Sequence, residues 1–404
     1  MVAIAFLFAP PYIAILPVLA VIAAAVTDAL FVRRAPVVHV ERAHVYARGI
    51  PTPLVITVAG AVAERARVRQ AVPPDVVATP SEADGSLECL LTPKRRGRHV
   101  LPPPSVRVTG PLGLGAWMHN ACGDAAEIVV FPDVITAHKL AQAVRRGRFR
   151  EQGRLVRGPL GLGTEFESIR DYLPDDDVRQ VNWLATARVG RPMTNTFRIE
   201  QDRDVICVID SGRLMSAPLD ERTRLDAAVD TATAIAMVCD VVGDRSGVLA
   251  FDGEVRRELA PRRNGADAVV RAIFDLEPVS VESDYELAFR RIGSWKRSLV
   301  FVLTDLLERS AARPLVDAMP TIARRHHVVV ASVTDPDIAS FATRMPDAPI
   351  DVYGSTVALE VLTARRLAAQ QIRATGAEVI EASADALPAA CIGAYLRAKA
   401  RARV

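Results

Sequence analysis

Two aspartates at the ends of apolar stretches are the residues best suited to do chemistry in this sequence. Asp210 closes VICVID at 205–210, and Asp305 closes SLVFVLTD at 298–305. If these stretches are neighbouring parallel strands at the point where strand order reverses, both carboxylates face one crevice. Paired carboxylates with hydroxyl oxygens suit a hard cation such as Mg²⁺. Each aspartate could instead only cap the loop or helix that follows its strand.

A second group of acids lies in the stretch DYLPDDDVRQVNW at 171–183. Its three consecutive aspartates, 175–177, could form a metal cradle, a catalytic carboxylate cluster or a solvated loop. Arginines recur every nine residues around them, at Arg170, Arg179 and Arg188, and can neutralise the acids through directional guanidinium–carboxylate pairs. We therefore interpret the stretch as structural.

Two aromatic residues of the same stretch, Tyr172 and Trp183, give it apolar anchors. We expect them to fold the stretch down against a domain surface, as a clasp between the domains on either side. The aspartates that end the two apolar strands then remain the better place for a ligand.

The C-terminal half of the chain alternates apolar strands with helical patterns from Asp204 onward. Continuous apolar runs separated by helices are typical of a doubly wound α/β domain with a buried parallel sheet. Asp252-Gly253 is a strong turn signal, so SGVLAFD and EVRRELA are expected to form a hairpin.

The preceding region, from 37 to about 130, reads as short β-branched runs separated by Pro, Gly and Asp clusters. This pattern predicts a small β-sandwich. The hexapeptide GPLGLG occurs twice, at 110–115 and 158–163. Because neither copy has the lysine and hydroxyl of a phosphate-binding loop, we interpret both as turns that need glycine.

The N-terminal stretch has no charged side chain before Asp28 and is long enough to cross a bilayer. Its prolines leave open whether it makes one crossing or a hairpin, and a signal peptide is the rival interpretation. Arg33 and Arg34 follow directly, so the positive-inside rule places the bulk of the chain in the cytoplasm, attached to the cell membrane.

These patterns predict four parts in the chain. We expect a transmembrane segment at 1–35, a β-rich domain at 36–135, a linker at 136–203 and an α/β domain at 204–404. The net charge of +3 over 404 residues does not suggest nucleic-acid binding. The five cysteines are scattered without a CxxC pair, which argues against a disulfide framework or a zinc site.

The stretches VICVIDSGRLM and LVFVLTDLLE resemble the first and last signatures of a von Willebrand factor A domain. The resemblance implies a metal-ion-dependent adhesion site made of Asp210, Ser283 and Asp305. The two serines of the family's DxSxS loop are replaced by Gly212 and Leu214, with Ser211 one residue out of register. Losing both hydroxyls should weaken Mg²⁺ binding, because coordination must then draw more on water.

The longer stretch GTEFESIRDYLPDDDVRQVNWLATARVGRP resembles the signature of the bacterial family called "domain of unknown function 58". The sequence departs from the family at Asp175, where the family has glycine. The matching positions are Glu165, Phe166, Arg170, Tyr172, Pro174, Asp176, Asp177, Arg179, Trp183, Ala185, Ala187 and Arg188.

This second resemblance implies a membrane-anchored, non-catalytic adaptor that binds protein partners through its A-like domain. Such proteins are associated with MoxR-type AAA+ ATPases and transglutaminase-like membrane proteins, in the assembly or remodelling of protein complexes. The alternative is a metal-dependent hydrolase that uses Asp210 and Asp305. The sequence lacks a GxSxG elbow, an HExxH helix and a Walker lysine, which favours the adaptor.

Overall fold

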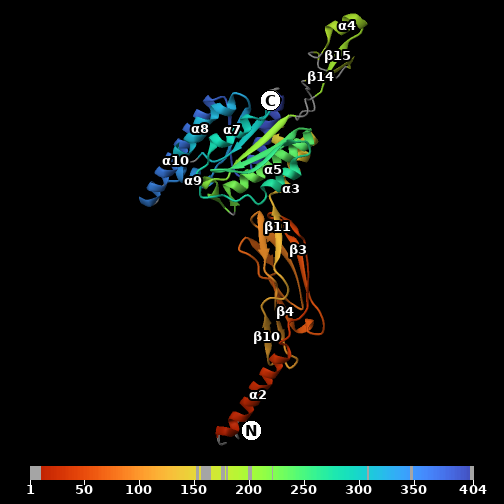
Figure 1. The fold of residues 1–404 in the computed structure, drawn as a ribbon, viewed down its shortest axis with the longest axis vertical. Helices are drawn as coiled ribbons and strands as arrows, with labels where there is room; N and C mark the ends of the chain where they lie inside the picture. The colour runs from red at the N-terminus through yellow and green to blue at the C-terminus, as the bar shows by residue number, and fades with distance from the viewer. Residues whose placement is uncertain are drawn as a thin grey trace. The chain divides into compact units, whose positions relative to one another are not determined.

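The computed structural model describes residues 11–151, 154–155, 165–173, 178, 181–198, 203–220, 222–306, 309–345 and 349–400. The chain divides into two compact units, Met1–Phe131 and Pro132–Val404 (Figure 1). The first unit is built mainly of strands, and the second is a mixed α/β structure.

The first unit contains three sheets that share one apolar core. One sheet has the order β1 (Val38–Arg42), β3 (Thr52–Val58), β7 (Ser86–Pro93), β5 (Val76–Thr79). The second has the order β10 (Ala116–His119), β9 (Ser105–Thr109), β4 (Ala66–Arg69), β6 (Glu82–Asp84), and the third β2 (Val45–Ala47), β11 (Ala126–Phe131), β8 (Gly97–Leu101). In β7 every second side chain is buried, because successive side chains of a strand point to opposite faces. These inward residues build the core with apolar residues of all three sheets.

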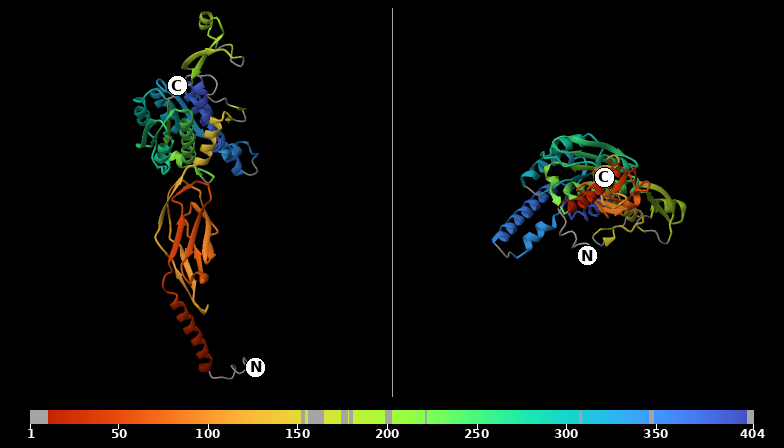
Figure 2. Two further views of the ribbon diagram at one scale, coloured as in Figure 1. Left: turned by 90° about the vertical axis from the view of Figure 1, so that its right-hand side faces the viewer. Right: turned by 90° about the horizontal axis from the view of Figure 1, so that it is seen from below.

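The helix α2 (Pro11–Phe31) precedes these strands and extends away from them (Figure 2). Among the residues that the structure describes, no helix is both long and apolar enough to cross a membrane. The transmembrane segment predicted at 1–35 is therefore not found there, and residues 1–10 lie outside the described part. Asp28 and Val32, near the end of this stretch, are buried in the first unit.

The second unit is organised around a six-stranded sheet. Its order is β20 (Val255–Arg262), β19 (Arg245–Phe251), β16 (Asp204–Asp210), β21 (Leu299–Leu303), β22 (His327–Val333), β23 (Glu378–Ala382). Only β20 is antiparallel, and it forms the predicted hairpin with β19 across Asp252-Gly253. The chain order reverses between β16 and β21, so the switch point expected from the sequence lies between these two strands.

Helices cover both faces of this sheet (Figure 1). The alternate side chains of β16 divide between two apolar clusters, as expected for a strand that is buried on both faces. One cluster includes α3 (Val134–Arg145), α5 (Arg224–Val242), α6 (Ala266–Ile273) and α11 (Leu387–Ala400). The other includes α7 (Tyr285–Gly293), α8 (Arg309–Ala323) and α10 (Pro349–Ala374), and α9 (Pro336–Thr343) precedes α10.

The region 136–203, predicted as a linker, is partly built into the second unit. Ala137, Ala141 and Val144 of α3 are buried in the same cluster as α5, because α3 presents them at helical spacing on one face. The remaining short elements are β12 (Arg150–Glu151), β13 (Arg154–Leu155), β14 (Glu165–Asp171), α4 (Trp183–Val189), β15 (Met193–Arg198), η3 (Arg213–Ser216), β17 (Pro218–Leu219) and β18 (Arg222–Thr223), with η1 (Ala63–Arg65) in the first unit.

The start of α5 depends on a reciprocal cap. The Thr223 side chain accepts the Asp226 N–H at 3.2 Å, and the Asp226 carboxylate accepts the Thr223 N–H at 2.8 Å. We expect Thr223→Ala to lower the free energy of unfolding by about 1 kcal/mol, because an N–H at the helix start loses its acceptor. Thr223→Ser keeps the hydroxyl and should cost much less in the same urea titration. Equal losses for the two variants would show that the cap does not stabilise the helix.

Candidate functional site

The predicted crevice lies where β16 and β21 end side by side. The two strands are hydrogen-bonded neighbours, with Ile209 opposite Leu303. Asp210 and Thr304, the next residue of each chain segment, therefore emerge at the same edge of the sheet. The prediction that these two strands are neighbours at the switch point is confirmed.

The carboxylate of Asp210 is buried and accepts four hydrogen bonds from the protein. Its Oδ1 accepts the Gly212 N–H at 2.8 Å and the Ser283 hydroxyl at 2.5 Å. Its Oδ2 accepts the Tyr285 hydroxyl at 2.7 Å and the Thr304 hydroxyl at 2.6 Å. Both oxygens are thus fully occupied by donors, as a buried carboxylate requires.

Tyr285 holds its donor position through packing. Its ring lies edge-on to Phe251, with 5.4 Å between centroids, and tilted against Phe289 at 6.2 Å. Asp284 caps the helix that carries it by accepting the Leu287 N–H at 2.9 Å. Burial, reinforced by the Asp210 carboxylate, raises the pKa of Tyr285 well above its usual value. The phenol therefore stays protonated and remains a hydrogen-bond donor.

Gly212 stands where the resemblance to an adhesion-site loop predicts a serine, and the structure has no room for a side chain there. A Cβ at this position would lie 2.1 Å from the Ser283 hydroxyl and 2.9 Å from the Val281 carbonyl oxygen. Only glycine leaves room for Ser283 to reach Asp210. Ser211 does not compensate, since its hydroxyl donates to the Phe251 carbonyl at 2.9 Å.

Asp305 is paired with a buried arginine. The Arg224 Nη1 lies 2.8 Å from Asp305 Oδ2, and both side chains are almost completely buried. A second acid, Asp335, lies 3.6 Å from the Arg224 Nη2, and the Leu306 N–H donates to Asp305 Oδ1 at 2.8 Å. Burial raises the pKa of Asp305, while the Arg224 guanidinium opposes that shift.

A second buried arginine extends this network along the sheet edge. Arg365 on α10 donates to the Ser332 hydroxyl at 2.8 Å and pairs with Glu381 at 2.6 Å. Ser332 in turn donates to Asp305, at 3.4 Å. Guanidinium groups from two helices thus surround the end of β21.

These contacts do not fit the Mg²⁺ site predicted from Asp210, Ser283 and Asp305. The structure joins Asp210 to Ser283, but it pairs Asp305 with Arg224 instead of leaving the carboxylate free for a cation. Mg²⁺ demands near-octahedral oxygen ligands, and here the Asp210 oxygens already accept protein donors while a fixed positive charge contacts Asp305. Within the described part of the chain, no group of three or more His, Cys, Asp or Glu residues is arranged to hold a metal ion.

Thr304, Tyr285 and Arg224 are among the residues of this network that were not predicted from the sequence. Thr304 precedes Asp305 directly and could have been included with it. Tyr285 lies two residues after Ser283 at the start of a helix, which was a usable signal. Arg224 had none, because its partner Asp305 is distant in the chain.

The family-signature residues lie partly outside the described residues. Asp176, Asp177 and Arg179 belong to the part that the structure does not describe, as does the side-chain placement of Glu165 and Phe166. Arg188 is exposed at the end of α4.

The prediction that Trp183 anchors this stretch against a domain surface is wrong. Trp183 begins α4 and is 71% exposed. The segment is instead ordered by local backbone contacts. β14 pairs with β15, the Tyr172 N–H donates to the Pro192 carbonyl at 3.0 Å, and Asn182 caps α4. A short self-contained hairpin leaves its tryptophan without a surface to cover.

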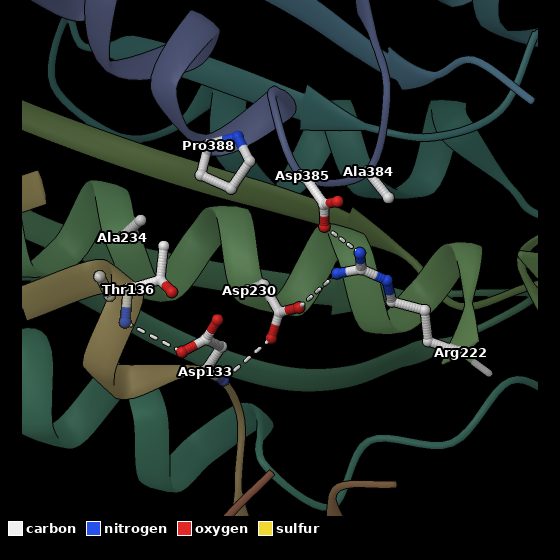
Figure 3. A pocket seen from close by; sticks show the side chains of 9 residues that line it. Asp133, Thr136, Arg222, Asp230, Ala234, Ala384, Asp385 and Pro388 are labelled. Carbon is white, nitrogen blue, oxygen red and sulfur yellow. Dashed lines mark hydrogen bonds and ion pairs between the residues drawn. The ribbon is translucent and has the colours of Figure 1, made fainter. Parts of the chain in front are cut away.

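A small polar cavity of about 180 Å³ lies among α3, α5 and the start of α11 (Figure 3). Arg222 bridges Asp230, at 3.8 Å, and Asp385. Asp230 also accepts the Asp133 N–H at 3.1 Å, and Asp133 caps α3 by accepting the Thr136 N–H at 2.9 Å. These acids are engaged in holding α3 and the strand β18 to α5, so the cavity is structural.

An open groove of about 570 Å³ adjoins the Asp210 site. Its walls are the start of α7 and one side of α8. Four carboxylates line it, without a basic residue among the lining side chains: Glu282, Asp284, Glu286 and Asp317. Ser283 and Tyr285, which bind Asp210, are part of the same wall.

Comparison with known proteins identifies relatives of the second unit. Residues 168–349 match the model of a family described as "Protein of unknown function DUF58". Proteins of Mycobacterium tuberculosis and Mycobacterium bovis, both described as uncharacterized, are each 31% identical over 193 residues. The aligned region is 45% of this chain and 57% of each relative, so the chain spans little more than half the length of these proteins.

The buried pair predicts a large stability difference between two arginine variants. Arg224→Met should lower the free energy of unfolding by about 3–5 kcal/mol, because it leaves Asp305 charged and unpaired. The double variant R224M/D305N, which removes both charges, should recover much of this loss. Arg313→Ala breaks an exposed pair with Asp317 and should cost less than about 1 kcal/mol. Urea denaturation followed by circular dichroism measures all three, and equal effects of R224M and R313A would contradict the buried pairing.

Because the carboxylate oxygens of Asp210 and Asp305 already have partners in the protein, we predict that Mg²⁺ does not stabilise it. A ligand that binds only the folded state raises the melting temperature in proportion to the logarithm of its concentration. We therefore expect the melting temperature to be the same in millimolar Mg²⁺ and in EDTA, at matched ionic strength. A rise with Mg²⁺ that the Asp210→Asn variant abolishes would contradict the geometry described above.

Proposed function

We propose that this chain, whose residues 168–349 match the DUF58 family model, is a non-catalytic adaptor that binds a protein partner through an A-like second unit. One observation carries the proposal. The loop and helix that hold Ser283 and Tyr285 on Asp210 also form a wall of the open acidic groove. The sheet edge thus presents an acidic surface beside a crevice whose own carboxylates are occupied. Three of the groove carboxylates, Glu282, Glu286 and Asp317, are exposed and pair with exposed arginines.

The sheet topology supports the A-like assignment. Five parallel strands and one antiparallel edge strand, with helices on both faces, match what the resemblance of VICVIDSGRLM and LVFVLTDLLE implies. The acidic residues that end β16 and follow β21 are where such a domain places its adhesion site. The first unit, with its three sheets around one core, fits the proposed β-sandwich-like domain.

The protein contacts made by Asp210 and Asp305 support a non-catalytic role. A nucleophilic aspartate must present an oxygen to the substrate, whereas both Asp210 oxygens accept protein donors. Asp305 is buried against Arg224. Nothing in these contacts favours the metal-dependent hydrolase that uses Asp210 and Asp305.

The acidic groove indicates a partner surface with lysine or arginine side chains. Glu286 and Asp317 are largely exposed on the two helices that flank it, and each pairs with an exposed arginine of its own helix. Complementary charge would accelerate encounter and fix the register of the partner more than it would add affinity. From the family resemblance, we propose a MoxR-type AAA+ ATPase as this partner, acting together with a transglutaminase-like membrane protein.

We place the protein at the cell membrane with its bulk in the cytoplasm. The apolar residues of α2 that the structure describes are exposed, and Arg33 and Arg34 follow the helix. Exposed apolar surface of this extent is typical of an interaction site. In this proposal, the N-terminal segment attaches the chain to the membrane and the second unit binds the partner.

Capture of the ATPase by charge-reversal variants tests the docking surface. We expect the double variant E286K/D317K to capture roughly 10-fold less MoxR-type ATPase from detergent-solubilised native membranes, because like charges then face each other. The measurement is a pull-down with the tagged full chain, quantified by mass spectrometry, with and without ATP.

Asp267→Lys, which changes the net charge by half as much as the double variant, provides a control outside the groove. Asp267 is an exposed acid on α6, which packs in the cluster on the other face of the sheet. Its reversal changes the net charge by the same kind of substitution outside the groove. Unchanged capture by E286K/D317K, or an equal loss with D267K, would remove the groove as the docking surface.

A further inference from the structure

The first GPLGLG loop, at 110–115, is fastened to α2 by one buried carboxylate. Asp28 accepts the N–H groups of Leu112 at 2.9 Å, Leu114 at 2.9 Å and Gly115 at 3.0 Å. Hydrogen bonds to an ionised acceptor are about twice as strong as neutral ones. Three such bonds to one side chain make the loop and the end of the helix a single structural element.

The glycines of this loop are needed for the close approach of α2. A Cβ at Gly110 would lie 2.3 Å from the Asp28 Cγ, and a Cβ at Gly115 would lie 2.2 Å from the Ala25 carbonyl oxygen. Gly113 has a φ of +70°, a backbone conformation that favours glycine. The motif is therefore built to seat the loop on the helix, which is more than a turn requires.

The leucine side chains between these glycines are exposed to solvent. Leu112 is 68% exposed and Leu114 is 52% exposed. Phe31, at the end of α2, is 77% exposed. Most loops of a soluble unit carry polar residues at such positions, so this exposed apolar tip calls for a partner surface.

The neighbouring helix shows what kind of partner fits. Every side chain described between residues 15 and 23 of α2 is exposed, and none of them is charged. A helix that docks in a protein groove is apolar on one stripe, whereas one that is apolar all round lies in a core or in lipid. The exposed apolar residues continue to the loop tip, so the medium that surrounds the helix also reaches the loop.

Charged and aromatic residues mark the boundary of this apolar surface. Arg33 and Arg34 are exposed directly after α2, and the Arg33 guanidinium lies 5.8 Å from the centre of the Trp117 ring. Tryptophan and basic residues are the side chains that concentrate at the membrane–water interface. Basic residues near the surface are also attracted by anionic headgroups.

We propose that the loop 110–115 is a second membrane contact of the first unit. Leu112 and Leu114 enter the acyl region beside α2, while Arg33 and Arg34 lie at anionic headgroups. Asp28 holds the loop at the depth at which its leucines reach lipid. This inference rests on the proposed membrane location and adds to it the residues that set the position of the first unit at the bilayer.

A fluorophore on the loop tests the contact directly. The five native cysteines are all buried, so a cysteine introduced on the surface can be labelled selectively with NBD. Leu114→Cys places the label on the loop tip. Leu90→Cys on β7 is the control, because Leu90 is exposed and lies far from α2. It pairs with Pro53 at the start of β3, whereas α2 leads into the opposite end of that strand, at Val58.

The labelled full chain is reconstituted into vesicles of phosphatidylcholine and phosphatidylglycerol and separated by flotation. We expect the label at 114 to shift to the blue and brighten, and the label at 90 to remain unchanged. Adding Asp28→Ala to the Leu114→Cys chain should remove most of the shift while the protein still floats. Asp84→Ala, which removes an exposed carboxylate of the same unit, should leave the shift intact.

The outcomes separate the loop from the membrane location. If the chain floats and the label at 114 does not respond, or responds only when soluble protein is added, the loop contact is wrong and the location stands. If the chain does not float, both proposals fail. If Asp28→Ala leaves the shift unchanged, Asp28 does not position the loop.

Discussion

The buried ion pair between Arg224 and Asp305 is the constraint on which the sheet edge at the ends of β16 and β21 depends. Taking two charges out of water is costly, and the cost is recovered only when each charge has a partner in good geometry. The pair therefore requires that α5 begin where it does, next to the end of β21. The cap formed by Thr223 and Asp226 fixes that start. The positive charge at this edge is therefore the Arg224 guanidinium, a side chain of the protein.

The arrangement around Asp210 follows from the same requirement that a buried charge has a partner. Its buried carboxylate needs hydrogen-bond donors, and Ser283, Tyr285 and Thr304 supply hydroxyls. Gly212 makes room for the first of these. Each of the two aspartates has thus been given a different kind of partner, hydroxyls for one and a guanidinium for the other. The oxygens of both aspartates are thus engaged by groups of the protein itself.

Much of the second unit could be predicted from the sequence, because local signals agreed with the global fold. The helix at 224–242 has a capping box before it and Gly243, with a positive φ, after it, and the continuous apolar runs gave the strands. The ion pair could not be predicted, since it joins residues that only the folded sheet brings together. Trp183 was misjudged for the opposite reason. Tryptophan side chains are usually buried, but the pairing of β14 with β15 orders this segment without burying Trp183.

An internal cation and a solution cation differ in what they allow the protein to do. A bound metal can leave, and its loss or its capture by a partner's carboxylate lets an adhesion site change state. A guanidinium tied to a helix remains at every metal concentration, and it cannot be deprotonated at physiological pH. The edge therefore has one charge state, in contrast to a metal site, which has a metal-bound and a metal-free state. In the proposed role, recognition then depends on surfaces outside the crevice, such as the groove beside α7 and α8. Its exposed carboxylates pair with arginines that are themselves exposed to solvent.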